Sequence, residues 1–203
     1  MTKLEINKIH ESLSVLIGQP MTSIGRSGIV TYVNFGELIE VDDFLFDKEG
    51  RVVYSENKKP VTFKVMEGKY AIEGNCCTRF ICDDEIILSK RDISLPNTQI
   101  GSRPDFSFDN FKWHIPGNNY YDEAIDKYRL KDITGFIIKK IEVSKFGDLT
   151  ILFGNGYALE YFMDTSSTND AMNWNFHEIT ATRSIITVSS SGIQKFYKGR
   201  QPA

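Results

Sequence analysis

Apolar residues at the start of the chain recur at the spacing of a helix. The segment Lys3–Ile17 carries them at steps of three and four, which predicts one helix with a single apolar stripe. Thr2 and Glu5 have the spacing of a capping box at its start, and Gly18 followed by Pro20 predicts its end. The stripe consists of Ile6, Ile9, Leu13, Leu16 and Ile17.

Beyond Pro20 the apolar residues alternate with polar ones, which is the period of a strand. Short polar turns such as Glu67-Gly68 and Asp83-Asp84 separate the predicted strands and favour antiparallel pairing, because parallel crossovers need about a dozen residues. The predicted strands are Ile29–Glu40 with a break at Phe35-Gly36, Arg51–Tyr54, Val61–Met66, Tyr70–Phe80 and Glu85–Lys90.

The middle of the chain differs from both patterns. Ser94–Asn119 contains three prolines and little periodicity, so we expect a long connection there. A second helix is predicted at Tyr120–Ile133, and a hairpin turn at Asn155-Gly156. The later strands are predicted at Ile137–Ser144, Leu149–Phe153, Tyr157–Met163, Trp174–Glu178 and Ile185–Ser189, before a basic tail from Lys195 onward.

The two ends of the chain have a similar order of elements. Leu16-Ile17-Gly18 followed by Ile29–Glu40 matches Ile133-Thr134-Gly135 followed by Leu149–Glu160. We therefore predict an α+β fold of two pseudo-repeated halves, each a helix followed by a mainly antiparallel β-sheet. The halves are 1–93 and 120–203, joined by the aromatic, proline-containing connection 94–119 into one compact unit. Chance similarity between generic strands is the alternative explanation.

Composition and charge narrow the class of protein. The 203 residues are 41% hydrophobic and 25% charged, which is typical of a folded globular domain. A net charge of −3 gives no general attraction to nucleic acid, and no apolar run reaches the roughly 18 residues of a membrane span. An odd number of cysteines (three) favours a reducing compartment, so we expect a cytoplasmic protein that binds neither nucleic acid nor membrane.

Several short blocks resemble an uncharacterised family of bacterial proteins. They are Thr22–Arg26, Asn34–Glu37, Asn75–Phe80, Ile87–Asp92 and Asp148–Phe153, followed by Leu159-Glu160 and Trp174. Two positions depart from the family pattern: Thr78 stands where an aromatic residue is expected, and Ser89-Lys90 where a glycine-serine pair is expected. The resemblance implies an architecture and no established activity. In general form the chain is also similar to the small immunity proteins carried beside bacterial toxins.

Four basic side chains are candidates for binding a small anion. Arg26 lies in the glycine-containing segment Ser23–Gly28, which predicts either an anion cradle or a plain hairpin turn with Arg26 on the surface. Arg79 and Arg91 flank a predicted hairpin, where they would line a polar pocket or form cross-strand ion pairs. His114 completes the candidate set. For the three arginines the structural interpretation is favoured over the functional one.

The most aromatic stretch of the chain, residues 106–114, falls in the connection. Phe106, Phe108 and Trp113 are candidates for an interaction surface, because exposed aromatic side chains carry much of the energy of protein interfaces. The favoured alternative is that this segment fills the seam between the halves, with Phe111 and Trp113 buried.

No motif of a catalytic, cofactor or metal site is found. The cysteines and histidines lack the paired spacing of zinc ligands, and the acidic loop from Asp164 lacks the residues of a calcium loop. We therefore expect no cofactor, and we favour a non-catalytic bacterial interaction protein, of the immunity type, with an unidentified protein partner. The alternative is a binder of a small anionic molecule, or an enzyme of unrecognised type, with Arg26, Arg79, Arg91 or His114 at the seam. The sequence predicts no oligomeric state.

Overall fold

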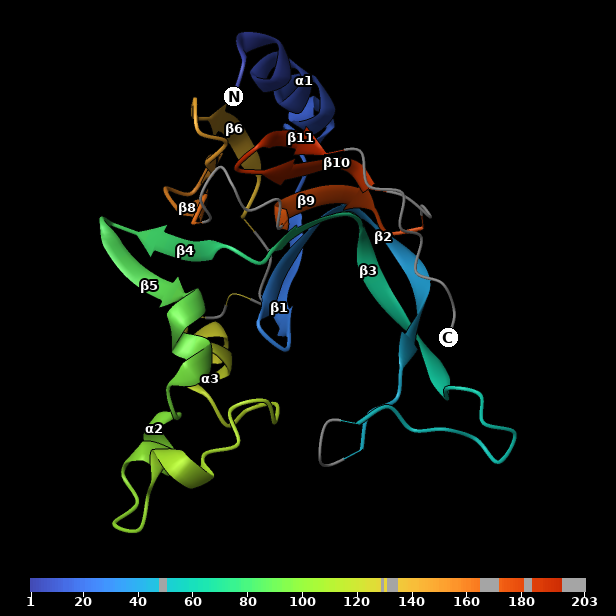
Figure 1. The fold of residues 1–203 in the computed structure, drawn as a ribbon, viewed down its shortest axis with the longest axis vertical. Helices are drawn as coiled ribbons and strands as arrows, with labels where there is room; N and C mark the ends of the chain where they lie inside the picture. The colour runs from blue at the N-terminus through green and yellow to red at the C-terminus, as the bar shows by residue number, and fades with distance from the viewer. Residues whose placement is uncertain (48–50, 129, 131–134, 165–171, 181–183, 195–203) are drawn as a thin grey trace.

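Two antiparallel sheets face each other across a shared core in the computed structural model of the chain (Figure 1). The structure describes residues 1–47, 51–128, 130, 135–164, 172–180 and 184–194. Within them, one sheet has the strand order β1-β2-β3-β9-β10-β11 and the other β5-β4-β8-β7-β6. The first sheet contains β1 (Met21–Ser27), β2 (Val30–Phe44), β3 (Thr62–Gly74), β9 (Met172–Glu178), β10 (Ser184–Ser189) and β11 (Gly192–Gln194). The second contains β4 (Cys77–Cys82), β5 (Glu85–Ser89), β6 (Ile138–Val143), β7 (Leu149–Phe153) and β8 (Ala158–Phe162).

Two longer helices and several short helical turns complete the fold. The first helix, α1 (Lys3–Leu13), continues into a 3-10 turn, η1 (Ser14–Leu16), and its predicted capping box is present between Thr2 and Glu5. The second long helix, α3 (Tyr120–Lys127), starts where predicted. Its predicted end at Ile133 lies outside the described residues. Shorter turns are η2 (Lys90–Ser94), α2 (Thr98–Gly101) and η3 (Phe108–Asn110), the last two within the predicted connection.

Both sheets combine strands from the two halves of the chain. The first half gives β1, β2 and β3 to one sheet and β4 and β5 to the other, whereas the second half gives β6, β7 and β8 to the latter and β9–β11 to the former. The halves meet where β3 pairs with β9 and β4 with β8. The α+β class and the antiparallel pairing are confirmed. The predicted repeat of a helix followed by its own sheet is not confirmed.

The first strands of the two halves also meet each other. Pro20 and Ile137 form an antiparallel bridge, and the Met21 amide donates to the Phe136 carbonyl at 2.9 Å. The Gly18 amide donates to the Ile138 carbonyl at 2.8 Å. These bonds join the edge of one sheet to the edge of the other, so the two sheets enclose a single core.

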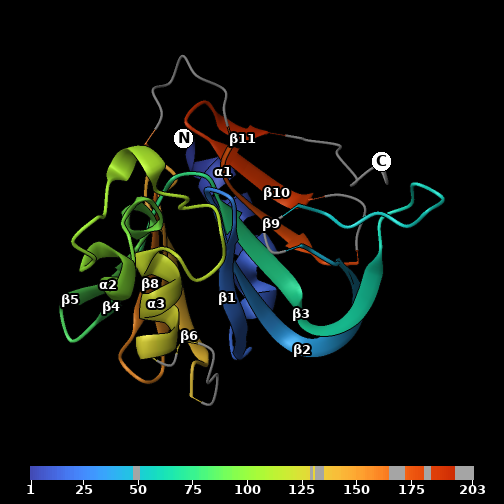
Figure 2. The ribbon, with the colours of Figure 1, turned by 90° about the horizontal axis from the view of Figure 1, so that it is seen from below.

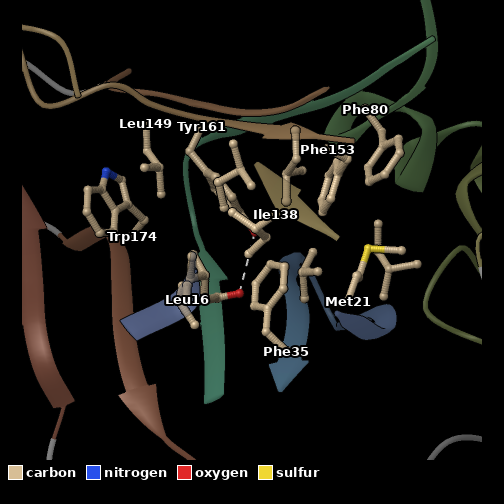
Figure 3. Packing of buried hydrophobic residues seen from close by; sticks show 14 of the residues in the cluster. Leu16, Met21, Phe35, Phe80, Ile138, Leu149, Phe153, Tyr161 and Trp174 are labelled. Atoms are coloured by element: carbon tan, nitrogen blue, oxygen red, sulfur yellow. Dashed lines mark hydrogen bonds between the residues drawn. The ribbon is translucent and has the colours of Figure 1, made fainter. Parts of the chain in front are cut away.

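The core lies between the facing sheets. Figure 3 shows Phe80, Phe153 and Tyr161 of one sheet pointing toward Met21 and Phe35 of the other. All five are at most 3% exposed, and each fully buried aromatic side chain removes about 150–250 Å² from water. Burial of this apolar surface is the main force that holds the sheets together.

Two predicted boundaries are wrong for a local reason. The segment before Gly28 forms β1 instead of a turn, and Glu67-Gly68 lies inside β3 instead of between two strands. At the predicted break, Gly36 has a φ of +89° and the pairing register shifts between Phe35 and Leu38. This is a bulge, which bends a strand without ending it, so β2 continues to Phe44.

The outer parts of β2 and β3 project away from the sheets as a long ribbon (Figure 1). We call the described residues of this ribbon and its tip, 37–47 and 51–68, the β-arm. Figure 2 shows that β2 and β3 curve strongly on their way to it. The predicted strand Arg51–Tyr54 is reduced to isolated bridges at the tip, namely Phe46 with Val52 and Tyr54 with Pro60.

Candidate functional site

A buried ion pair joins the first sheet to the start of α3. Arg26 on β1 donates from Nε to Asp122 Oδ1 at 2.9 Å and from Nη2 to Asp122 Oδ2 at 2.8 Å. The two side chains are 6% and 21% exposed. Paired donation of this kind fixes both the distance and the orientation of the two groups. The expected surface position of Arg26 is therefore wrong.

The same pair organises the end of the connection. Arg26 Nη2 also donates to the carbonyls of Trp113 and Ile115, at 3.3 and 3.5 Å. Asp122 Oδ2 accepts from the Gly117 amide at 2.7 Å. The connection is thus tied to the sheet through both partners of the pair, which we call the Arg26–Asp122 anchor.

Burial around the anchor changes the acidity of nearby phenols. Tyr121 is 1% exposed, and this burial raises its pKa well above the usual value for a tyrosine. Burial also raises the pKa of Tyr32, with a smaller contribution from the Glu67 carboxylate. Both phenols therefore stay neutral at physiological pH and serve as packing groups with a polar tip.

Three phenylalanines of the connection gather into a cluster beyond the anchor. The ring centroids of Phe106 and Phe108 are 4.9 Å apart, and those of Phe106 and Phe111 are 5.8 Å apart, both edge to face. Phe108 is 64% exposed and the other two rings are half-buried. We call these three residues the aromatic cluster.

Trp113 behaves differently from the aromatic cluster. It is half-buried and packs against the core, whereas Phe111 is half-buried within the aromatic cluster. The seam-filling interpretation expects both side chains to be buried, so it describes Trp113 only in part. Its carbonyl accepts from Arg26 and from Asn119 Nδ2, the latter at 2.9 Å. The segment thus has two parts: Trp113 holds it to the core, and Phe108 faces solvent.

Arg79 lies on the second sheet, opposite Glu160 of β8. Its Nη2 is 3.2 Å from Glu160 Oε2, and its guanidinium carbon is 4.1 Å from the ring centroid of Phe162. The favoured prediction of a cross-strand ion pair is confirmed for Arg79, but the acidic partner comes from the other half of the chain. The Arg79 side chain is 35% exposed, so such a pair stabilises the sheet by about 0.2–1 kcal/mol.

The remaining two candidates are on the surface. Arg91 is exposed within η2, and His114 is exposed beside Trp113, with their rings perpendicular. No hydrogen bond or ion pair among the described residues joins Arg26, Arg79, Arg91 and His114 to one another. Their role in binding a ligand stays a prediction.

Two surface depressions lie on either side of β6. One, of about 380 Å³, is lined by Lys139, Lys140 and Tyr157, among others. The second, of about 240 Å³, lies between α1 and β6 and includes His10 together with the same two lysines. Neither is lined by the four candidate residues. No group of three or more potential metal ligands occurs among the described residues.

The cysteines differ in their surroundings. Cys76 is fully buried, and burial raises the pKa of its thiol to about 12, whereas Cys77 is exposed. At physiological pH Cys76 is therefore a neutral, unreactive core residue, which is the predicted behaviour of a small apolar side chain.

Sequence reasoning missed three features of these surfaces. Asp122 could be recognised only as an acidic residue in the first turn of a helix, three positions after Asn119, and nothing local identifies Arg26 as its partner. Glu160 was not paired with Arg79 because the two strands come from different halves. The pattern predicts Phe63 and Met66 of the β-arm as ordinary strand residues and does not show that they are exposed.

Comparisons with known protein families, curated proteins and solved structures find no match for this chain. None of the helices in the described parts combines the length and the apolar character needed to cross a bilayer.

Proposed function

We propose that this chain is a non-catalytic cytoplasmic interaction protein that binds a protein partner through the aromatic cluster. The observation that carries the proposal is the combination of an exposed Phe108 with a rigid support. Phe108 is 64% exposed, yet its neighbours in the cluster and the Arg26–Asp122 anchor hold the segment in place. A pre-ordered aromatic side chain binds with less loss of conformational entropy than a mobile one.

The composition of the cluster fits the centre of an interface. Phenylalanine is enriched in interface cores, and large aromatic anchors surrounded by less important contacts dominate binding energies. Phe106 and Phe111 flank Phe108 and would exclude water from it once a partner covers the cluster. Trp113 is half-buried and packs against the core, so it supports the segment and is not itself the residue that contacts the partner.

The test compares two phenylalanines of nearly equal exposure, one inside the aromatic cluster and one outside it. Phe108→Ser removes the cluster ring, and Phe146→Ser removes a ring that is 63% exposed in the turn between β6 and β7. Tagged proteins are used to capture partners from the source cells, and bound protein is quantified. Loss of a hot-spot side chain costs about 2 kcal/mol or more, so Phe108→Ser should weaken capture of the partner at least thirtyfold, while Phe146→Ser leaves it unchanged. Equal capture by both variants contradicts the proposal.

An immunity-type role belongs to the same proposal. The net charge of −3, the small size and the similarity in general form to immunity proteins support it. If a toxin gene neighbours the gene for this chain, production of the wild-type protein should protect cells from that toxin, and Phe108→Ser should not. A Phe108→Ser protein that still protects them would separate the immunity role from the aromatic cluster.

We also propose that the two halves arose from one duplicated unit that exchanged strands. In each half, three consecutive strands enter one sheet and the next strands enter the other. The helices support this order: α1 packs on β6 and β10, and α3 on β1 and β5. Residues 1–103 and 104–203, produced together, should assemble into a folded protein; either piece folding alone would contradict the exchange.

A further inference from the structure

The β-arm has an open hydrogen-bonding edge on β2. The neighbouring strand β1 pairs with β2 only between Val30 and Phe35, because the chain before Met21 turns away to meet Ile137. Beyond the bulge, β2 pairs with β3 alone in the part of the chain that the structure describes. Among the described residues, none pairs with the edge of β2 opposite β3 between Leu38 and Phe44.

The backbone groups at this edge can be identified from the ladder. The Leu45 amide donates to the Val61 carbonyl at 2.9 Å, and bonded residues alternate along an antiparallel pair. Leu38, Glu40 and Asp42 therefore direct their N–H and C=O groups away from β3. The next outward amide, that of Phe44, is capped by the Asp43 side chain at 2.8 Å. The edge therefore presents the backbone N–H and C=O groups of three alternate residues. A strand added beside β2 would pair with all of these donors and acceptors.

The side chains along this edge are acidic on one face. Glu40 and Asp42 are 63% and 60% exposed and share one cation, Lys64, at 3.6 and 3.1 Å. Glu37 follows the glycine of the bulge and Asp43 lies on the opposite face, so the same seven residues carry four carboxylates in all. The edge therefore carries more negative charge than the β-arm itself neutralises.

On the opposite face of the same strand, two apolar residues precede Asp43. Ile39 and Val41 lie there with Val65 of β3, since side chains alternate between the faces, and all three are half-buried. Large apolar side chains are exposed on both faces of β3: Phe63, opposite Asp43, is 46% exposed, and Met66, opposite Glu40, is 58% exposed. Charged residues at a strand edge prevent aggregation, but they do not account for exposed apolar residues beside them.

From these observations we propose that the β2 edge at Leu38–Asp42 binds an extended basic segment of a partner protein as an additional strand. Lysine or arginine side chains of the segment lie beside Glu40 and Asp42, and its alternate apolar side chains lie beside Ile39 and Val41. This site is separate from the aromatic cluster and can fail or succeed independently of it.

Charge argues against a second copy of this chain at the same edge. Antiparallel pairing of two β2 edges centred on Val41 places Glu40 of one copy opposite Asp42 of the other. Directly opposed like charges destabilise a strand pair. The same carboxylates that favour a basic strand therefore disfavour self-pairing.

The test uses ten-residue peptides as probes of the intact protein. One alternates lysine and valine, one alternates glutamate and valine, and one alternates lysine and glycine, which keeps the charge and removes the strand preference. Amide hydrogen exchange is followed by NMR at low salt. The lysine–valine peptide should bind and slow exchange at Leu38, Glu40 and Asp42. The double variant E40K/D42K should bind it about tenfold or more weakly and should gain binding of the glutamate–valine peptide.

A matched variant controls for total charge. E11K/D105K makes the same change at two exposed acidic residues outside the β-arm, and it should bind the lysine–valine peptide within twofold of the wild type. Equal binding of the lysine–glycine peptide, unchanged exchange at the three edge amides, or equal losses in both double variants would each overturn the proposal. So would a wild-type dimer in light scattering that E40K/D42K dissociates, because a second copy would then occupy the edge.

Discussion

Removal of the Asp122 carboxylate is the most informative perturbation of the anchor. In Asp122→Ala the Arg26 guanidinium, only 6% exposed, keeps its charge and loses the two bonds of 2.8 and 2.9 Å. Breaking a buried pair by removing one partner costs about 3–5 kcal/mol, because the remaining charge is neither paired nor hydrated. Asp122 is 21% exposed and the carbonyls of Trp113 and Ile115 still accept from Arg26, so we expect the lower end, about 3 kcal/mol.

The loss should appear both globally and locally. Urea unfolding followed by circular dichroism should give a free energy of unfolding about 3 kcal/mol below that of the wild type. For a chain of about 200 residues this corresponds to a Tm lower by roughly 6–12 °C. Hydrogen exchange should increase most in residues 106–119, because the Gly117 amide and the Arg26 side chain no longer hold this segment.

A double-mutant cycle separates the pair from its surroundings. Replacing both members by apolar residues, Arg26→Met with Asp122→Leu, leaves no unpaired buried charge. It should therefore cost at least 1 kcal/mol less than the sum of the two single changes. Strictly additive losses, or a loss below about 1 kcal/mol in Asp122→Ala, would refute the claim that this pair holds the connection.

Other predictions follow from packing and acidity. In Gly68→Ala the new Cβ would lie 2.7 Å from the Phe35 carbonyl oxygen, so urea unfolding should show a free energy of unfolding lower by about 1–3 kcal/mol. In the control Gly154→Ala the nearest atom to the new Cβ is 3.8 Å away, and the free energy of unfolding should change by less than about 0.5 kcal/mol. At pH 8 a thiol reagent should modify Cys77 rapidly and Cys76 only after unfolding; equal rates would contradict the burial of Cys76. Because the pKa of Cys76 is higher in the folded state, its contribution to stability should be complete below about pH 9 and should be lost as pH rises toward 12; urea titrations should show a smaller decline in Cys76→Ala.

Local signals in the sequence predicted most of the elements and their type. The capping box of Thr2 and Glu5, the helix start at Tyr120 and the strand Leu149–Phe153 depend on residues close together in the chain, and all three are observed. At Gly36 and Gly68 the same reasoning failed. There glycine permits a bulge and a close approach between strands, and a sequence pattern cannot distinguish these from a turn.

The arrangement of the strands depends on contacts that no local pattern encodes. β3 pairs with β9 and β4 with β8, about 80 to 110 residues away along the chain, so a division into two self-contained halves is the simpler expectation. Because Arg26 and Asp122, and likewise Arg79 and Glu160, are far apart along the chain, no local pattern identifies them as partners. The aromatic stretch was recognised as important from composition alone, but only the structure distinguishes the supporting Trp113 from the exposed Phe108.

Photo-crosslinking in living cells tests the central claim most directly. A photoreactive phenylalanine analogue is placed at position 108 in one strain and at position 146 in another, where the natural side chains have nearly equal exposure. Irradiation should link the protein to one partner of defined mass from position 108 and yield no such product from position 146. The same product from both positions, or none from position 108, would contradict a partner bound at the aromatic cluster.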